Sequence, residues 1–174
     1  QNIMVGEFGE VLVMDWGLAK LLPEAALADG SPDEEAGTGL PLWQMKDPFK
    51  TKSGLVKGTP RYMAPEQAEG KIDQIDERTD IYSLGAILYA ILTLRPPILG
   101  DTVREVLVKV ATGDITSPTM FNQTAVEGKL PAANDDEVAY SLSHCPDRKI
   151  PPALSAVTMK AMARRKADRY QSVS

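Results

Sequence analysis

Apolar residues cover nearly every face of the stretch formed by residues 79–93. A helix that is apolar all round is buried in a protein core or lies in a membrane, and a membrane span needs about 20 apolar residues. This run is shorter, and the sequence Arg-Pro-Pro at residues 95–97 would stop a helix. The pattern therefore predicts a central core helix, with Asp80 near its start capping the free backbone amides.

Two other segments carry apolar residues at helical spacing. In residues 102–112 these residues recur at i, i+3, i+4 and i+7, which predicts an amphipathic helix; they are Val103, Val106, Leu107 and Val110. Residues 152–163 predict another helix, whose expected inner face consists of Leu154, Val157, Ala161 and Met162. The polar, poorly periodic residues 113–150 between the two are expected to form an irregular insertion.

The first 14 residues alternate between β-rich runs and glycine-containing turns. Residues 3–5 and 11–14 are the two β-rich runs, and Gly-Glu-Phe-Gly at residues 6–9 connects them, which predicts a β-hairpin. The hairpin would place Asn2 at the mouth of one strand and Asp15 just past the end of the other. Their side chains would then converge on one point.

Composition narrows the class of protein. Hydrophobic residues make up 43% of the chain and charged residues 25%, as is usual for a soluble globular domain. The net charge of −5 argues against nucleic acid as a partner. The single cysteine, Cys145, excludes an internal disulfide and fits a reducing, cytoplasmic location. Together with His144 it supplies too few ligands for a metal site.

Both ends of the sequence suggest a longer protein. The chain begins with Gln1 rather than Met, and residues 170–174 read as the beginning of a helix. We therefore expect this chain to be a fragment of a longer protein. Any sensor or membrane-anchoring segment of that protein would lie outside residues 1–174.

Two short motifs frame a long polar segment. Asp15-Trp16-Gly17 follows the second β-rich run directly, and the later run from Gly58 ends in Ala-Pro-Glu at residues 64–66. An acid at the end of a strand, beside a glycine turn, suits a gated site for a metal and a phosphorylated ligand. Either tripeptide alone would be a weak signal, but both in this order, together with three further motif matches downstream, make a specific one. The stretch resembles the magnesium-binding and activation segment of bacterial, eukaryotic-like Ser/Thr protein kinases, with Trp16 in place of the usual Phe.

The resemblance implies a fold that is mainly α with a small β-hairpin. Residues 1–174 would form a partial protein kinase domain, namely the C-terminal helical lobe truncated at both ends. The Gly-rich loop, the ATP-anchoring lysine and the catalytic Asp would all precede Gln1. We therefore expect the full-length protein to transfer the ATP γ-phosphate to a protein Ser or Thr, and the isolated fragment to be inactive.

By the same resemblance, Asn2 and Asp15 would hold the Mg²⁺ ions that bridge the ATP phosphates. Gly17 would supply the turn after the metal-binding acid. Thr59 would hydrogen-bond the catalytic Asp and Lys, and with Pro60 and Arg61 it would belong to the part of the activation segment that meets the substrate.

Other residues would regulate or support this segment. Thr51 and Ser53 stand where kinases often carry activating phosphates, although both could equally be solvated hydroxyls in a lysine-rich loop. Glu66 and Arg169 would form a buried ion pair that anchors the activation segment. Asp80 would also brace the catalytic loop.

Several alternatives stay open on the sequence alone. A pseudokinase scaffold would keep the fold without the chemistry, although such a scaffold has no need of magnesium ligands at Asn2 and Asp15. A small helical interaction domain with chance motifs is a weaker reading. Besides ATP and a protein substrate, a second kinase copy for trans-phosphorylation is a possible partner.

Overall fold

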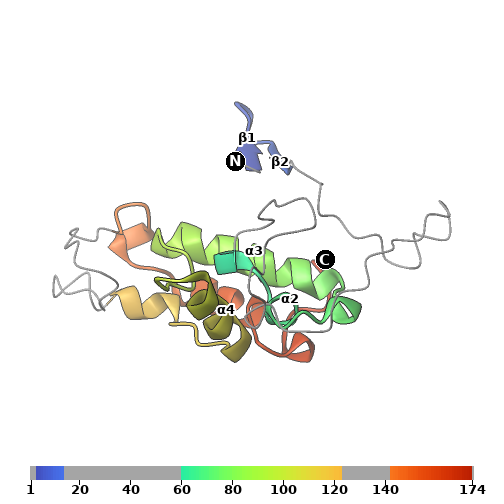
Figure 1. The fold of residues 1–174 in the computed structure, drawn as a ribbon. Helices are drawn as coiled ribbons and strands as arrows, with labels where there is room; N and C mark the ends of the chain where they lie inside the picture. Colours follow the sequence, from blue (N-terminus) through green and yellow to red (C-terminus); the bar gives the residue numbers. More distant parts are fainter. Residues whose placement is uncertain (1–2, 14–59, 123–141, 174) are drawn as a thin grey trace. The chain divides into compact units, whose positions relative to one another are not determined.

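The computed structural model describes residues 3–13, 60–122 and 142–173. The chain divides into two compact units, residues 1–36 and residues 37–174. Figure 1 shows the elements of both units.

A hairpin forms the described part of the first unit. Strand β1 (Ile3–Val5) pairs antiparallel with β2 (Val11–Val13), in a register that sets Ile3 opposite Val13. The backbone N–H of Gly6 donates to the Glu10 carbonyl at 2.9 Å, which closes the turn. Gly9 lies in the turn at φ +83°, a conformation that glycine adopts without strain. The predicted hairpin is therefore confirmed.

Helix α3 (Glu77–Thr93) is the longest helix of the described residues (Figure 1). The predicted helix is confirmed, with two corrections. Leu84 and Ile91 are 52% and 58% exposed, so not every face is buried. The N-cap is Asp76 and not Asp80, because the helix begins at Glu77 and the Asp76 carboxylate accepts from the backbone N–H of Arg78. Asp80 already lies inside the first turn.

Helix α4 (Val103–Thr112) confirms the predicted amphipathic helix. Thr102 caps its start by accepting from the backbone N–H of Glu105 at 3.1 Å, and Gly113 ends it at φ +72°. The inner face differs slightly from the prediction, because Val103 is exposed and Ala111 takes part in the burial instead.

Helix α6 (Pro152–Ala161) is present, but its predicted inner face is wrong in part. Leu154 and Val157 are 41% and 42% exposed, whereas Ser155 and Thr158 are buried. Small residues occupy the buried face because α6 packs closely on α3. The buried Thr158 hydroxyl has a hydrogen-bond partner within the same helix, because it donates to the Leu154 carbonyl at 2.8 Å.

Six short elements connect and flank these helices. They are η2 (Pro60–Tyr62), α2 (Pro65–Ala68), η3 (Ile72–Gln74), η4 (Pro118–Met120), η5 (Pro146–Arg148) and η6 (Lys166–Asp168). The described parts of residues 113–150 contain η4, η5 and the helical residues 121–122, joined by the irregular chain that was predicted.

The core of the second unit surrounds α3. One apolar cluster joins α3 to the segments beyond it and contains Ala64, Tyr82, Ala86, Tyr89, Leu92, Phe121, Leu142, Cys145, Ile150 and Met162. A second cluster joins α2 to α4 and contains Ala68, Ile98, Val106, Leu107 and Val110. Both clusters therefore hold α2, and with it Glu66, against the body of the unit.

Candidate functional site

Several residues predicted for the site lie outside the described residues. These are Asn2, Asp15, Gly17, Thr51, Ser53 and Thr59. The proposed meeting of Asn2 with Asp15 therefore stays a prediction. The hairpin register concerns the neighbouring backbone: Ile3, which follows Asn2, pairs with Val13, which lies two residues before Asp15.

Helix α2 presents Glu66 in its first turn. The sequence begins a helix here because Pro65 stands at the first helical position, where its missing N–H costs nothing. The Gln67 side chain then accepts from the backbone N–H of Ala64 at 3.0 Å. A carboxylate in the first turn also suits the positive end of the helix dipole.

The side chain of Arg169 forms a bidentate ion pair with Glu66. Its Nη1 and Nη2 atoms each lie 2.8 Å from one carboxylate oxygen, and the two side chains are 0% and 5% exposed. The expected contact between these two residues is therefore present in the structure. The pair joins residues 103 positions apart in the sequence.

The remaining N–H groups of Arg169 donate to backbone carbonyls. Nε donates to Ala163 at 2.8 Å, Nη1 to Arg78 at 2.9 Å and Nη2 to Arg164 at 3.2 Å. With the two bonds to Glu66, these use all five N–H groups of the guanidinium. A buried charge of this kind is stable only when its hydrogen bonds are satisfied, so Arg169 ties together three segments of the chain.

Glu66 receives a further hydrogen bond that the sequence pattern did not predict. The Thr79 hydroxyl donates to Glu66 Oε1 at 2.7 Å. Burial alone would raise the pKa of the Glu66 carboxyl, but the hydrogen bonds from Arg169 and Thr79 outweigh it, and the pKa lies below its ordinary value. Glu66 is therefore held as a carboxylate.

Tyr82 packs against the same group. The guanidinium carbon of Arg169 lies 5.0 Å from the centre of the Tyr82 ring, a cation–π contact. Among the described residues, the buried Tyr82 hydroxyl has no hydrogen-bond partner. Burial raises the pKa of this hydroxyl, so it stays neutral.

Asp76 gathers a second group of charges beside the ion pair. Its carboxylate lies 2.6 Å from Arg78 Nη2 and 2.8 Å from Lys166 Nζ. Lys166 also donates to the Gln74 carbonyl. The hydrogen bond from Arg78, opposed by partial burial and assisted by Lys166, holds the pKa of Asp76 well below its usual range. The signal for this cap was readable in the sequence, since Asp76 and Thr79 have the spacing of a capping box.

Three other predicted site residues lie in the described part of the chain, namely Asp80, Pro60 and Arg61. Asp80 is exposed, and its carboxylate has no hydrogen-bond partner among the described residues; partial shielding from water raises its pKa. Pro60 begins η2, and Arg61 beside it is exposed. None of these three residues bonds to the Glu66–Arg169 pair.

His144 and Cys145 both contact the end of α3. The His144 Nε2 lies 3.1 Å from the Leu92 carbonyl at the end of α3. The Cys145 Sγ lies 3.4 Å from the same nitrogen. No group of three or more His, Cys, Asp and Glu side chains in the described part of the chain is arranged to hold a metal.

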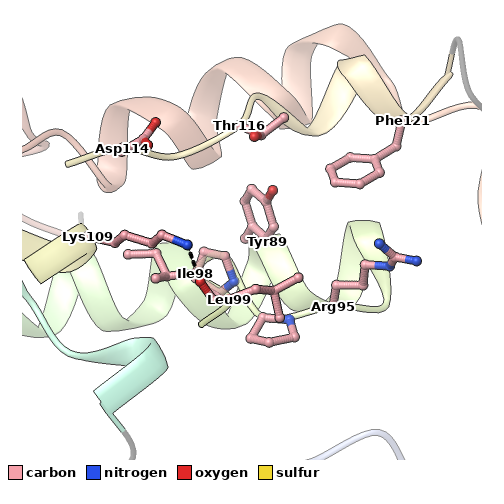
Figure 2. A pocket seen from close by; sticks show the side chains of 10 residues that line it. Tyr89, Arg95, Ile98, Leu99, Lys109, Asp114, Thr116 and Phe121 are labelled. Carbon is pink, nitrogen blue, oxygen red and sulfur yellow. Dashed lines mark hydrogen bonds between the residues drawn. The ribbon is translucent and has the colours of Figure 1, made fainter. Parts of the chain in front are cut away.

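A separate pocket of about 230 Å³ lies between α3 and the segments on either side of α4. Figure 2 shows Tyr89 and Phe121 in it, with Arg95 at one end and Lys109 and Asp114 at the other. The Lys109 amine is already engaged, because it donates to the Leu99 carbonyl at 2.9 Å and pairs with Glu105. This pocket shares no residue with the Glu66–Arg169 pair.

Comparison with known proteins identifies the family to which this sequence is similar. A family model described as the protein kinase domain matches residues 1–144. A serine/threonine-protein kinase PknD of Protochlamydia amoebophila is 36% identical over 99% of this chain, and one of Chlamydia trachomatis is 34% identical over 99%. A probable serine/threonine-protein kinase of Streptomyces coelicolor is 28% identical over 98%.

The chain spans only 14%, 15% and 18% of the lengths of these three relatives. None of the helices in residues 60–122 and 142–173 combines the length and the apolar content that a membrane span requires. The family match covers the hairpin, the Glu66 segment, α3 and α4. The chain therefore belongs to the protein kinase family.

Proposed function

We propose that this chain is part of a Ser/Thr protein kinase that transfers the γ-phosphate of ATP to Ser or Thr hydroxyls of a protein substrate. The observation that carries the proposal is the similarity, along 99% of the chain, to proteins named serine/threonine-protein kinases. Residues 1–174 would form the helical lobe together with the hairpin before it, and the catalytic Asp and ATP-anchoring lysine would lie elsewhere in the protein.

Asn2 and Asp15 would be the magnesium ligands of this kinase. Oxygen ligands of this kind suit Mg²⁺, which would neutralise charge on the phosphates of ATP. The backbone register of the hairpin supports the assignment, because it pairs Ile3, the neighbour of Asn2, with Val13, two residues before Asp15.

Glu66 and Arg169 would hold the end of the activation segment in place. Their bidentate pair is buried and fully hydrogen-bonded, which suits a fixed anchor better than a moving part. Thr59, Pro60 and Arg61 precede this anchor and would meet the substrate protein. Thr51 and Ser53 would be phosphorylation sites of the same segment, modified by a second kinase copy.

The test is phosphate transfer by the full-length protein from radiolabelled ATP to a generic Ser/Thr substrate. Asp15→Ala is expected to lower the rate about 100-fold or more, since the charge-stabilising metal is lost. Asp73→Ala is the matched control, because Asp73 is an exposed acid in η3 and is expected to keep the full rate.

Two outcomes would contradict the proposal. Equal rates for wild type and Asp15→Ala would remove Asp15 from the reaction. Binding of ATP and Mg²⁺ without any transfer, in a protein with Asp15 intact, would instead support a pseudokinase scaffold. The isolated residues 1–174 are expected to transfer no phosphate above the Asp15→Ala background.

A further inference from the structure

Helix α3 turns two hydroxyl groups, one helical turn apart, toward residues 60–68. The Thr79 hydroxyl lies 2.7 Å from Glu66 Oε1 on α2. The Ser83 hydroxyl lies 3.4 Å from the carbonyl of Tyr62 in η2, a longer and weaker contact. The two bonds therefore tie both short elements of this segment to the same face of one long helix.

The direction of the Thr79 bond is fixed by its partners. Glu66 is a carboxylate and only accepts, so the hydroxyl hydrogen of Thr79 points at Oε1. The hydroxyl oxygen in turn faces the backbone N–H of Asp76, at 3.4 Å, at the start of α3. Thr79 is 2% exposed, so water does not compete for these bonds. The hydroxyl therefore links the cap of α3 to the ion pair.

Arg169 and Thr79 hold Glu66 in different ways. Arg169 follows the short element η6 and reaches Glu66 from a segment near residue 169. Thr79 belongs to α3, around which the core of the unit is built. Arg169 contacts α3 through the Arg78 carbonyl and so links Glu66 to α3 indirectly, whereas the Thr79 hydroxyl bonds the Glu66 carboxylate to α3 directly.

We propose that Thr79 is a positioning residue, which sets α2 and the preceding residues 60–63 against α3 and thereby shapes the surface that receives the protein substrate. The inference rests on the proposed kinase function for its effect on substrate. Ser83 contributes the smaller share of the same restraint. Neither hydroxyl touches ATP or the transferred phosphate in this role.

The experiment compares Thr79→Val with Thr79→Ser in the full-length protein. Valine keeps the shape and removes the hydroxyl, while serine keeps the hydroxyl. For Thr79→Val we expect the KM for a peptide substrate to rise about tenfold, the factor that corresponds to losing a hydrogen bond to a charged group, with the KM for ATP unchanged. Thr79→Ser is expected to keep the peptide KM of the wild type. Ser83→Ala is expected to raise the peptide KM by less than Thr79→Val does.

Hydrogen exchange separates this inference from the proposed function. In Thr79→Val, exchange is expected to accelerate at the amides of residues 67–70, which donate to the carbonyls of Ala64, Pro65 and Gln67, and to stay unchanged in α4. This readout holds even for a protein that transfers no phosphate. Unchanged exchange at residues 67–70, equal rises of both KM values, or failure of Thr79→Ser to restore the peptide KM would each overturn the inference.

Discussion

At the scale of single residues, the Glu66–Arg169 pair is stabilised by a complete set of hydrogen bonds and not by charge attraction alone. Bringing two charges out of water costs several kcal/mol for each ion, and their attraction offsets this only with good geometry. Here the carboxylate accepts three hydrogen bonds and the guanidinium donates five. The pair is therefore far more sensitive to loss of one partner than an exposed ion pair would be.

Removing Arg169 should be strongly destabilising. In Arg169→Gln the Glu66 carboxylate is left buried without its partner, and we expect the free energy of unfolding to fall by about 3–5 kcal/mol. Urea unfolding followed by circular dichroism measures the change. Arg165→Gln is the control: in the described part of the chain Arg165 pairs with Asp168, and its side chain is 79% exposed, so no change is expected. Similar losses in both variants would contradict this account.

At the scale of elements, the contact of α3 with α6 depends on Gly85. A Cβ added there would lie 2.8 Å from both Ala161 Cβ and Met162 Cγ, closer than real Cβ contacts allow. The same closeness explains why Ser155 and Thr158 line the buried face of α6 in place of Leu154 and Val157. Glycine in a helix interior lowers helix propensity, so its presence here reflects packing.

Gly85→Ala should therefore destabilise the protein although alanine favours helix. Overpacking is expected to cost about 1–3 kcal/mol, measured by chemical unfolding. Adding Ala161→Gly removes one of the two clashing atoms. The double variant is then expected to lose less stability than the sum of the two single variants. An additive result, or a gain in stability from Gly85→Ala alone, would show that the helices are not in close contact.

At the scale of the whole molecule, acid is expected to weaken the fold through two carboxylates. The pKa values of Glu66 and Asp76 both lie below their ordinary values in the folded protein. A depressed carboxyl pKa contributes stability above the unfolded pKa of about 4, and that stability is lost as pH falls toward the folded value. The free energy of unfolding should thus decrease steadily below about pH 4.5.

The variant Asp76→Asn tests how much Asp76 contributes to the loss of stability at low pH. Asparagine also caps helices, but it does not titrate, so stability near pH 7 should fall while the slope below about pH 4.5 becomes shallower. Thermal or urea unfolding at a series of pH values measures the slope. Asp73→Asn, at an exposed acid, serves as the control and should leave the slope unchanged. An unchanged slope in Asp76→Asn would exclude Asp76 as a source of the acid sensitivity.

The sequence allowed the hairpin, the core helix and the contact of Glu66 with Arg169 to be predicted, because each leaves a local pattern or matches a family motif. The inner face of α6 could not be predicted from the sequence. Apolar periodicity favours Leu154 and Val157, and it carries no information about how closely a neighbouring helix approaches. The start of α3 was misplaced because the run of apolar residues begins later than its cap at Asp76. Thr79 was missed because a buried hydroxyl acquires its partner only through the tertiary fold.

The 103-residue separation of Glu66 from Arg169 has a consequence for synthesis on the ribosome. Glu66 leaves the exit tunnel long before its guanidinium partner, and Thr79, 13 residues later, is the first of its two side-chain donors to emerge. Until residue 169 emerges, α2 can dock only by placing an unmatched charge in a dry site. A nascent chain that stops short of this arginine is therefore expected to keep α2 undocked and open to chaperones and proteases.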